Sequence, residues 1–432
     1  MNTVEKFQTI KKQLSLTSLT GLKEYDASLL LANDVAVFLG AGIRQGSFFK
    51  MFLPFLLKEY SYDFSNLSKG CILFFNSQSY RFRKDYMAAA DRFRSIIDHV
   101  AVVDERVSSG VPIDFHAFAD IWLILIWGFQ LRHVQLPVSG KFFLIKQLGR
   151  CFKLHRDLCK NRRMISEAKA LVTQFDALDS ENLFAQFCRR LLIPTVTLEH
   201  GHFHATCCKD GKASVIGTPF EGLASDFFFA WGEYAKLEAI SNGISPDRIK
   251  CVGSLKIKGM QLPVTPKDKA EGFSVILNGV YGAQDNAVLL ATAEKIGERF
   301  QISFIVRPHP FLGIDKAILE KYSHFLRISP QEESIADLVS ASSFSICGNS
   351  TVLSELLFYR QPVFELQPVD TVDYYERFTG LKFSNDSDLS ILLEQMFQAP
   401  EQEDGLIEKY RKMLFFTDHA DEAYQKAISE II

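Results

Sequence analysis

The spacing of apolar residues becomes regular after residue 164. From there, runs of four to six apolar residues alternate with amphipathic stretches of ten or more, as in residues 170–175 and the stretch 181–193 that follows. Alternation of short buried strands with helices is typical of βαβ units and predicts a parallel sheet. The alternation starts again at Phe273 and continues to residue 366. The pattern therefore predicts two such units in tandem.

The stretch 259–272 separates the two regular regions. It concentrates Lys, Pro and Gly without apolar periodicity, which is typical of a linker. The 432 residues also exceed the roughly 250 to 300 at which single cores stop growing. We therefore expect an α/β fold with two Rossmann-like units, 1–258 and 273–410, facing each other across a cleft. A C-terminal helix at 411–432 is expected to pack back on the first unit.

The first part of the chain gives weaker signals. The run 35–39 is predicted to be a buried strand, and Gly40, Gly42 and Arg44 follow it. This glycine turn is either a tight connection to a helix or a loop that faces an acceptor or a phosphate. Its spacing departs from the dinucleotide fingerprint, so no NAD site is expected. Residues 70–166 are predicted to be mostly helical, with one strand at 71–75.

Two apolar or basic stretches in this part have more than one interpretation. Residues 117–127 (AFADIWLILIW) are predicted to form a buried helix, and an interfacial helix is the alternative. Residues 141–163 interleave cations with apolar residues at near-helical spacing. They form either a solvated helix face or a patch that touches anionic lipid or a polyanionic acceptor.

Composition narrows the class of protein. A hydrophobic fraction of 47% and a charged fraction of 23% are ordinary for a folded chain, and a net charge of −3 gives no reason to expect a nucleic-acid partner. The N-terminus lacks the apolar core of a secretory signal, and no run reaches about 18 apolar residues. The 8 cysteines show no C-x-x-C spacing. We expect a cytoplasmic protein without a metal or cofactor.

Residues Arg307-Pro308-His309-Pro310 directly follow an apolar run of the second unit. The two prolines favour a rigid, extended turn. Such a turn presents a guanidinium and an imidazole at fixed positions, where both can donate hydrogen bonds to a phosphate. An ordinary loop that happens to contain histidine is the alternative.

A second candidate lies between the apolar run 343–347 and the helical stretch after it. Gly348 is followed by Asn349, Ser350 and Thr351, which supply hydroxyl and amide groups at a helix start. Glu355 lies one turn further, where a carboxylate can accept from the hydroxyls of a ribose. A plain helix cap explains the same residues without a ligand.

Glycines at two other strand ends complete the expected phosphate contacts. Gly253 and Ser254 end the last strand of the first unit, and their amides can touch phosphates. A plain turn explains this pair equally well. Gly279, after the first apolar run of the second unit, is assigned to the same ligand.

The third motif is Glu199-His200-Gly201-His202-Phe203-His204, at a strand end of the first unit. Histidine exchanges its proton near neutral pH, so one of these side chains is expected to act as a general base. A structural role is one alternative and zinc binding is another, although Cys207 and Cys208 lie too close together for an ordinary tetrahedral site.

Residues 170–366 resemble a known group of enzymes. The motifs P-T-V-x-x-E-H-G, W-G-E-Y-A-K, G-I-S-P-D-R-I-K-C-V-G-S, R-P-H-P and G-N-S-T-V-L-S-E-L-L look like those of bacterial surface-polysaccharide glycosyltransferases of GT-B fold. That group includes sialyl-, polysialyl- and Kdo transferases and CDP-glycerol glycerophosphotransferases. The resemblance implies that His309, Pro310, Ser350 and Thr351 hold the nucleotide of the donor. It also implies that His200 is the catalytic base. Glu199 stands where many relatives have Gln.

We expect transfer of a sugar from a CMP- or UDP-type donor to a capsule or lipopolysaccharide acceptor, as the resemblance implies. Arg307, His309, Asn349, Ser350 and Thr351 are expected to stabilise the leaving phosphate without a metal. A base opposite the donor favours a single, inverting displacement. His200, tuned by Glu199, takes the proton of the acceptor, and Gly40, Gly42, Arg44 and His202 lie on the acceptor side. A lipid-linked glycan acceptor would bring the protein to the inner face of the cytoplasmic membrane. A nucleotide-sugar 2-epimerase and a non-catalytic subunit of a polysaccharide assembly complex are the alternatives.

Overall fold

The computed structural model describes most of the chain. The residues it describes are 3–41, 58–77, 84–109, 115–199, 201, 208–209, 212–213, 222–255, 270, 272–278, 285–309, 313–367, 377–415 and 419–432. By its internal contacts the chain divides into two compact units. Unit 1 comprises residues 1–256 and 417–432, and unit 2 comprises residues 257–416.

Unit 1 is built on a seven-stranded sheet in the order β1-β3-β2-β4-β5-β8-β9. All neighbouring strands are parallel except β1, which pairs antiparallel to β3. The strands are β1 (Lys58–Asp63), β2 (Ile72–Asn76), β3 (Val100–Ser109), β4 (Ala170–Thr173), β5 (Thr195–Leu198), β8 (Phe227–Ala230) and β9 (Ile249–Cys251). A separate antiparallel pair consists of β6 (Cys208–Lys209) and β7 (Lys212–Ala213).

Both faces of this sheet are buried. Successive side chains of β2 point to opposite faces, and each set lies in a hydrophobic core. Leu73 and Phe75 join the core beneath α1, α7 and α9, whereas Ile72 and Phe74 join the core beneath α5 and α17. The helices of unit 1 are α1 (Thr3–Ser15), α2 (Ala27–Leu30), α3 (Ala32–Ala41), α5 (Lys84–Ile96), α6 (Phe115–Gln130), α7 (Val138–Lys160), α8 (Arg162–Ile165), α9 (Asp179–Arg190), α10 (Glu233–Ser241), the 3-10 turn η2 (Pro246–Arg248) and α17 (Ala420–Ser429).

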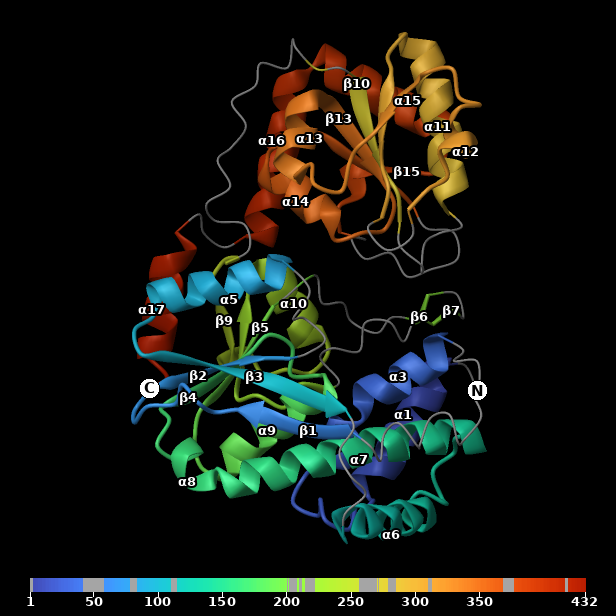
Figure 1. The fold of residues 1–432 in the computed structure, drawn as a ribbon. Coiled ribbons are helices and arrows are strands. Elements are labelled where there is room, and N and C mark those ends of the chain that lie inside the picture. The colour runs from blue at the N-terminus through green and yellow to red at the C-terminus, as the bar shows by residue number, and fades with distance from the viewer. Residues whose placement is uncertain are drawn as a thin grey trace. The chain divides into compact units, whose positions relative to one another are not determined.

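Unit 2 has a six-stranded parallel sheet in the order β12-β11-β10-β13-β14-β15. Helices α11 and α15 lie on one side of it and α13 and α14 on the other (Figure 1). The elements are β10 (Gly272–Ile276), α11 (Asp285–Phe300), β11 (Phe304–Arg307), α12 (Lys316–Leu319), β12 (Phe325–Ile328), α13 (Ile335–Ala341), β13 (Ser342–Cys347), α14 (Val352–Phe358), β14 (Val363–Leu366), η5 (Thr379–Leu381), β15 (Lys382–Phe383), α15 (Asp386–Gln398) and α16 (Pro400–Leu414).

The last helix, α17, returns to unit 1 and lies beside α5 (Figure 1). Tyr424 packs its ring against Phe93 and Phe229, and Asp421 forms a bidentate pair with Arg92 at 2.8 and 2.9 Å. The sequence predicts that the C-terminal helix begins at residue 411, but residue 411 lies inside α16.

The structure corrects three predictions for the first part of the chain. Residues 35–39 lie in helix α3, not in a strand, because Val35 and Ala36 repeat the buried position of Ala32 with helical spacing. A five-residue apolar run fits both structures. Residues 100–109 form the strand β3, inside the stretch predicted to be mostly helical, and residues 58–63 form β1. Both strands contain polar residues that interrupt the apolar pattern of a buried strand. Residues 117–127 do form a helix, but one side of it is exposed rather than buried.

Candidate functional site

The strand order of unit 2 locates a candidate ligand site. Numbered along the unit, the order is 3-2-1-4-5-6, which is the doubly wound arrangement whose direction reverses between its first and fourth strands. Those strands are β10 and β13. In open α/β sheets, ligands bind outside the carboxyl ends of the strands at this reversal.

Three side chains occupy matching positions at that edge. Ile276 of β10 is in register with Arg307 of β11 and with Cys347 of β13. Two residues beyond this row lie Asn278, His309 and Asn349. The sheet therefore brings the Arg-Pro-His-Pro motif, after β11, and the Gly-Asn-Ser-Thr motif, after β13, to one edge, on either side of β10.

Asn278 and Gly348 are in close contact. A Cβ added to Gly348 would overlap the amide group of Asn278 and lie 2.5 Å from its Cγ. Asn278 is 2% exposed, and its backbone NH donates to Oδ1 of Asn286 at 2.7 Å. The side chain of Asn278, which follows β10, thus requires glycine at position 348. Asn278 carries no motif of its own, and the sequence analysis missed it, choosing Gly279, which lies outside the described residues.

Arg307 has partners within its own unit. Its guanidinium donates to Oγ of Ser329 at 2.8 Å and to the carbonyl oxygens of Pro330 and Gln331. Burial lowers the pKa of Arg307, and the charges of Glu333, Glu332 and Glu355 oppose that shift. The side chain therefore fastens the loop after β12, and its contact with phosphate stays a prediction. Pro310 lies outside the described residues.

The second motif begins helix α14 as predicted. The hydroxyl of Ser350 accepts from the backbone NH of Val352 at 3.4 Å, and the carbonyl of Thr351 accepts from the hydroxyl of Ser354 at 2.6 Å. Glu355 lies one turn in, and its charge acts on both Arg307 and Tyr359. Ser350 and Thr351 therefore lie at the carboxyl end of β13, the same sheet edge as Arg307.

Unit 1 has its own polar cluster at the carboxyl edge of its sheet. The order of its parallel strands reverses between β2 and β4. At that point Nδ2 of Asn76 donates to Oδ1 of Asp104 at 3.1 Å, and Nε2 of Gln174 donates to Oδ1 of Asn76 at 3.4 Å. None of these three residues was predicted, because single amide or carboxylate side chains near strand ends form no recognisable motif.

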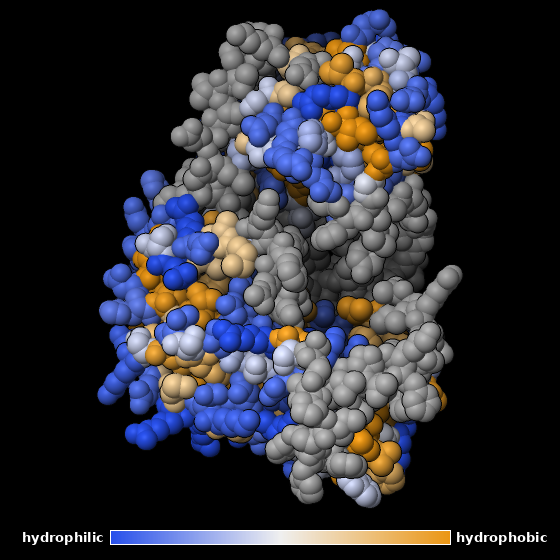
Figure 2. Space-filling model, in the orientation of Figure 1, coloured by the Kyte–Doolittle hydropathy of each residue, from blue (hydrophilic) through white to orange (hydrophobic). Residues whose placement is uncertain are grey.

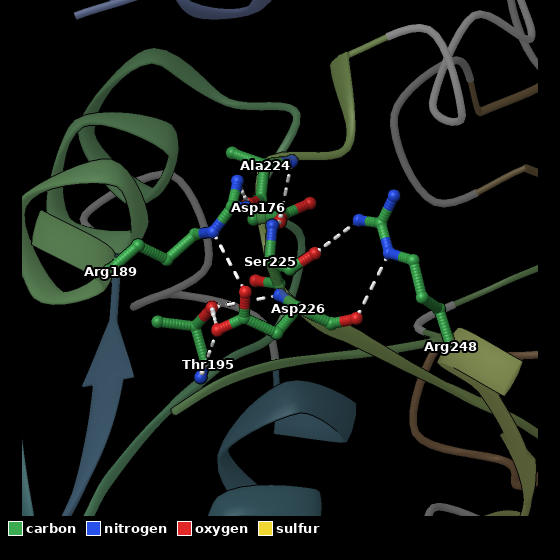
Figure 3. Close-up of polar contacts among 7 residues, drawn as sticks. All are labelled: Asp176, Arg189, Thr195, Ala224, Ser225, Asp226 and Arg248. Atoms are coloured by element: carbon green, nitrogen blue, oxygen red, sulfur yellow. Dashed lines mark hydrogen bonds and ion pairs between the residues drawn. The ribbon is translucent and has the colours of Figure 1, made fainter. Parts of the chain in front are cut away.

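Asp176, just after β4, is a buried carboxyl with a defined cradle (Figure 3). Its Oδ2 accepts from the backbone NH groups of Ala224 and Ser225 at 3.0 and 2.5 Å. Its Oδ1 accepts no hydrogen bond from the described part of the chain. Burial raises the pKa of Asp176 to about 6, against the lowering effect of those hydrogen bonds.

Segment 224–226 is held from three directions (Figure 3). Arg248 donates to the carbonyls of Ser225 and Asp226 at 2.5 and 3.0 Å. Arg189 donates to Oδ1 of Asp226 at 2.8 Å, and Thr195 donates to Oδ2 of the same carboxylate from its NH and its hydroxyl. Because every bond converges on this segment, the position of the Asp176 carboxyl is fixed by contacts from α9, β5 and η2.

Asp176→Asn is expected to change how stability depends on pH. A carboxyl whose pKa rises from 3.8 to about 6 on folding is protonated in the native state at low pH, and that stabilisation is lost as pH rises through 6. The wild-type chain should therefore lose roughly 2 kcal/mol from this group between about pH 4 and 7, a loss absent from the variant. Denaturant unfolding at both pH values measures it. Parallel profiles for the two proteins would contradict the assignment.

The side chain of Glu199 accepts a hydrogen bond from the backbone at the end of a neighbouring strand. It is 3% exposed, and its Oε2 accepts from the backbone NH of Trp231 at 2.5 Å. Its charge also raises the pKa of Tyr424, after the larger effect of burial. Glu199 therefore links the end of β5 to the end of β8, since its own backbone NH also donates to the carbonyl of Phe229 at 2.9 Å. His200 and His202, together with Gly42 and Arg44, lie outside the described residues, so their roles stay predictions.

Two glycines of the prediction lie in defined places. Gly40 lies in α3, so it does not form the predicted turn. Gly253 has φ of +80°, a backbone conformation that favours glycine, and its NH donates to the carbonyl of Trp231 at 3.2 Å. Ser254 is 5% exposed, and its hydroxyl has no hydrogen-bond partner among the described residues. This pair thus ends β9 at the same edge as Asp176 and Glu199.

Within the described part of the chain, no three His, Cys, Asp or Glu side chains are arranged to hold a metal ion. No helix in that part is long and apolar enough to cross a membrane. The histidines at 200, 202 and 204 lie outside the described residues.

Comparison with known proteins identifies the fold. No known protein family and no curated protein matches the sequence. Among solved structures, a complex of S. aureus MnaA with UDP superposes with a TM-score of 0.55 at 10% identity, over 84% of this chain and 98% of that one. The Neisseria meningitidis UDP-GlcNAc 2-epimerase bound to UDP-GlcNAc gives 0.53 at 12% identity, over 83% and 99%. The glycotransferase of kitacinnamycin gives 0.54 at 10% identity, over 84% and 100%.

These likenesses confirm the predicted fold class. The chain has the α/β architecture of GT-B-type proteins, with two units that each contain a largely parallel sheet. Identities of 10–12% establish the fold alone. The reaction has to be inferred from the side chains. The three similar structures are a complex with UDP, an epimerase with a bound nucleotide sugar and a glycotransferase.

Proposed function

We propose that the chain is an enzyme that acts on a nucleotide sugar and holds its nucleotide at the carboxyl edge of the unit 2 sheet. The observation that supports this proposal is the strand order, which brings the carboxyl ends of β11, β10 and β13 to one edge, at the reversal between β10 and β13. His309, Asn278 and Asn349 follow these three strand ends. An imidazole, amides and the hydroxyl of Ser350 are donors suited to phosphate oxygens. Glu355 supplies an acceptor for ribose hydroxyls.

Glycosyl transfer is the reaction that the sequence motifs favour. The donors at the unit 2 edge would stabilise the charge that develops on the leaving phosphate, without a metal. His200 would take the proton of a hydroxyl on a capsule or lipopolysaccharide acceptor, in a single inverting displacement. The donor would be of the CMP or UDP type.

Epimerisation at carbon 2 of a nucleotide sugar is the second candidate, and two findings favour it. The Neisseria meningitidis neighbour is a UDP-GlcNAc 2-epimerase. Inverting a carbon also requires groups that remove and return a proton. The carboxyl edge of unit 1 carries three carboxyl groups, those of Asp104, Asp176 and Glu199.

One assay separates the two reactions. The protein is incubated with CMP- and UDP-sugars in D2O without an acceptor, and the products are followed by NMR and mass spectrometry. Epimerisation predicts a second nucleotide sugar that carries solvent deuterium at the inverted carbon. Glycosyl transfer predicts an unchanged sugar until a glycan acceptor is added, and then release of the nucleotide. If neither occurs although a nucleotide sugar binds, the enzyme proposal fails and a non-catalytic subunit of an assembly complex takes its place.

A further inference from the structure

Helix α6 presents a row of large apolar side chains to solvent. Trp122, Leu125 and Phe129 are 69%, 61% and 64% exposed, and Ile121 and Ile126 are 40% and 36% exposed. Their spacing of three, four and one residues puts them on one side of the helix. In Figure 2, hydrophobic residues reach the surface at the lower right of the view, where Figure 1 draws α6. These five residues are called the α6 face below.

The opposite side of α6 is firmly attached to unit 1. Trp127 is 1% exposed, and its Nε1 donates to the carbonyl of Thr20 at 2.9 Å. Nε2 of Gln130 donates to the hydroxyl of Thr20 at 2.9 Å, and Leu131 is fully buried. The α6 face is therefore held outward by a packed helix, so its exposure is a property of the fold.

Cations border the α6 face. The guanidinium of Arg132 stacks over the ring of Phe129, with 3.8 Å between its Cζ and the ring centroid. Nζ of Lys141 donates to the carbonyl of Arg132 at 2.7 Å. His133 is exposed beside them. Residues 121–141 contain no Asp or Glu, and Asp120 directly precedes this segment. The charged side chains described beside the α6 face, Arg132 and Lys141, are both positive.

We propose that the α6 face docks on an anionic membrane surface, with the apolar side chains in the lipid interface and Arg132 and Lys141 on the headgroups. Apolar and aromatic residues bordered by basic ones are the composition of interfacial helices. A symmetric contact between two copies would instead set the cations of one copy against those of the other. Anionic headgroups complement both parts of the surface. This proposal is independent of the reaction.

The sequence supplies its own reporter for the test. The chain has 3 tryptophans, and Trp127 and Trp231 are 1% and 5% exposed. A change of solvent exposure on binding is therefore read from Trp122. Adding vesicles of phosphatidylcholine with phosphatidylglycerol to the full chain should shift the emission to the blue and co-sediment the protein. Vesicles of phosphatidylcholine alone should bind less, and added salt should weaken binding to the anionic vesicles.

Matched variants separate the α6 face from general stickiness. Leu125→Ser with Phe129→Ser should reduce partitioning to anionic vesicles at least about tenfold, since each buried apolar side chain contributes favourably. Leu192→Ser with Ile391→Ser alters residues that are 91% and 55% exposed elsewhere and should leave it unchanged. Equal loss in both pairs, or no binding by the wild-type chain, overturns the proposal. Emission that is already blue without vesicles, with a dimer in sedimentation, shows that a second copy covers the face.

Discussion

Replacing Gly348 by alanine is expected to destabilise unit 2 and to abolish most nucleotide binding. The added methyl group would overlap the buried amide of Asn278. Overpacking of this kind typically costs about 1–3 kcal/mol. Relief requires Asn278 to move away from the strand end where we place the nucleotide, so affinity should fall at least about tenfold alongside stability. Denaturant unfolding and calorimetric titration measure the two effects.

Gly405→Ala is the matched control in the same unit. Gly405 lies inside α16, and an added Cβ there would meet nothing within 4 Å. Alanine in an exposed helix interior is about 0.5–1 kcal/mol more favourable than glycine. This variant should therefore be slightly more stable than the wild type and bind nucleotide equally. If Gly348→Ala and Gly405→Ala behave alike, the contact between Gly348 and Asn278 has no importance for the site.

His309→Ala is expected to weaken nucleotide binding by roughly 10- to 100-fold. A hydrogen bond to a charged group contributes about 1.5–3 kcal/mol, and His309 lies two residues beyond the strand row next to Asn278 and Asn349. The variant should retain its folded stability, since the side chain is only partly buried. Calorimetric titration with the nucleotide measures the change.

His324→Ala tests whether the effect belongs to the site. His324 lies in the same unit, but its carbonyl accepts from the backbone NH of Phe304 at the opposite, amino edge of the sheet. Its ring contacts Glu294. This variant should lose some stability and keep its nucleotide affinity. Equal affinity loss in both histidine variants would move the nucleotide away from the carboxyl edge.

The parallel strands after residue 170 could be predicted from the sequence for a physical reason. Strands of a parallel sheet that is covered on both faces are short apolar runs. The run at 170–175 contains β4, and the run at 273–278 contains all of β10 except its first residue, Gly272. Edge and irregular elements lack that signal. Strand β1 is an edge strand with alternating polar residues, and β3 ends in a polar stretch.

The candidate site was only half predictable. Motifs at strand ends make His309 and Ser350 candidates, because turn chemistry is local. Their place at the same sheet edge as Asn278 depends on the strand order, which no local pattern reveals. Asp176 directly follows the predicted strand 170–175, but its backbone partners Ala224 and Ser225 lie 48 and 49 residues away in the sequence. Long-range contacts of this kind decide which carboxyl is buried.

Binding of a nucleotide by unit 2 is the central claim. Calorimetric titration of the full chain with CMP, CDP, UDP, GDP and their sugars, followed by hydrogen exchange with the nucleotide that binds, tests it most directly. We predict saturable binding of one nucleotide and slower exchange in residues 272–278, 304–309 and 345–355. The absence of binding by every nucleotide, or protection confined to unit 1, would contradict it.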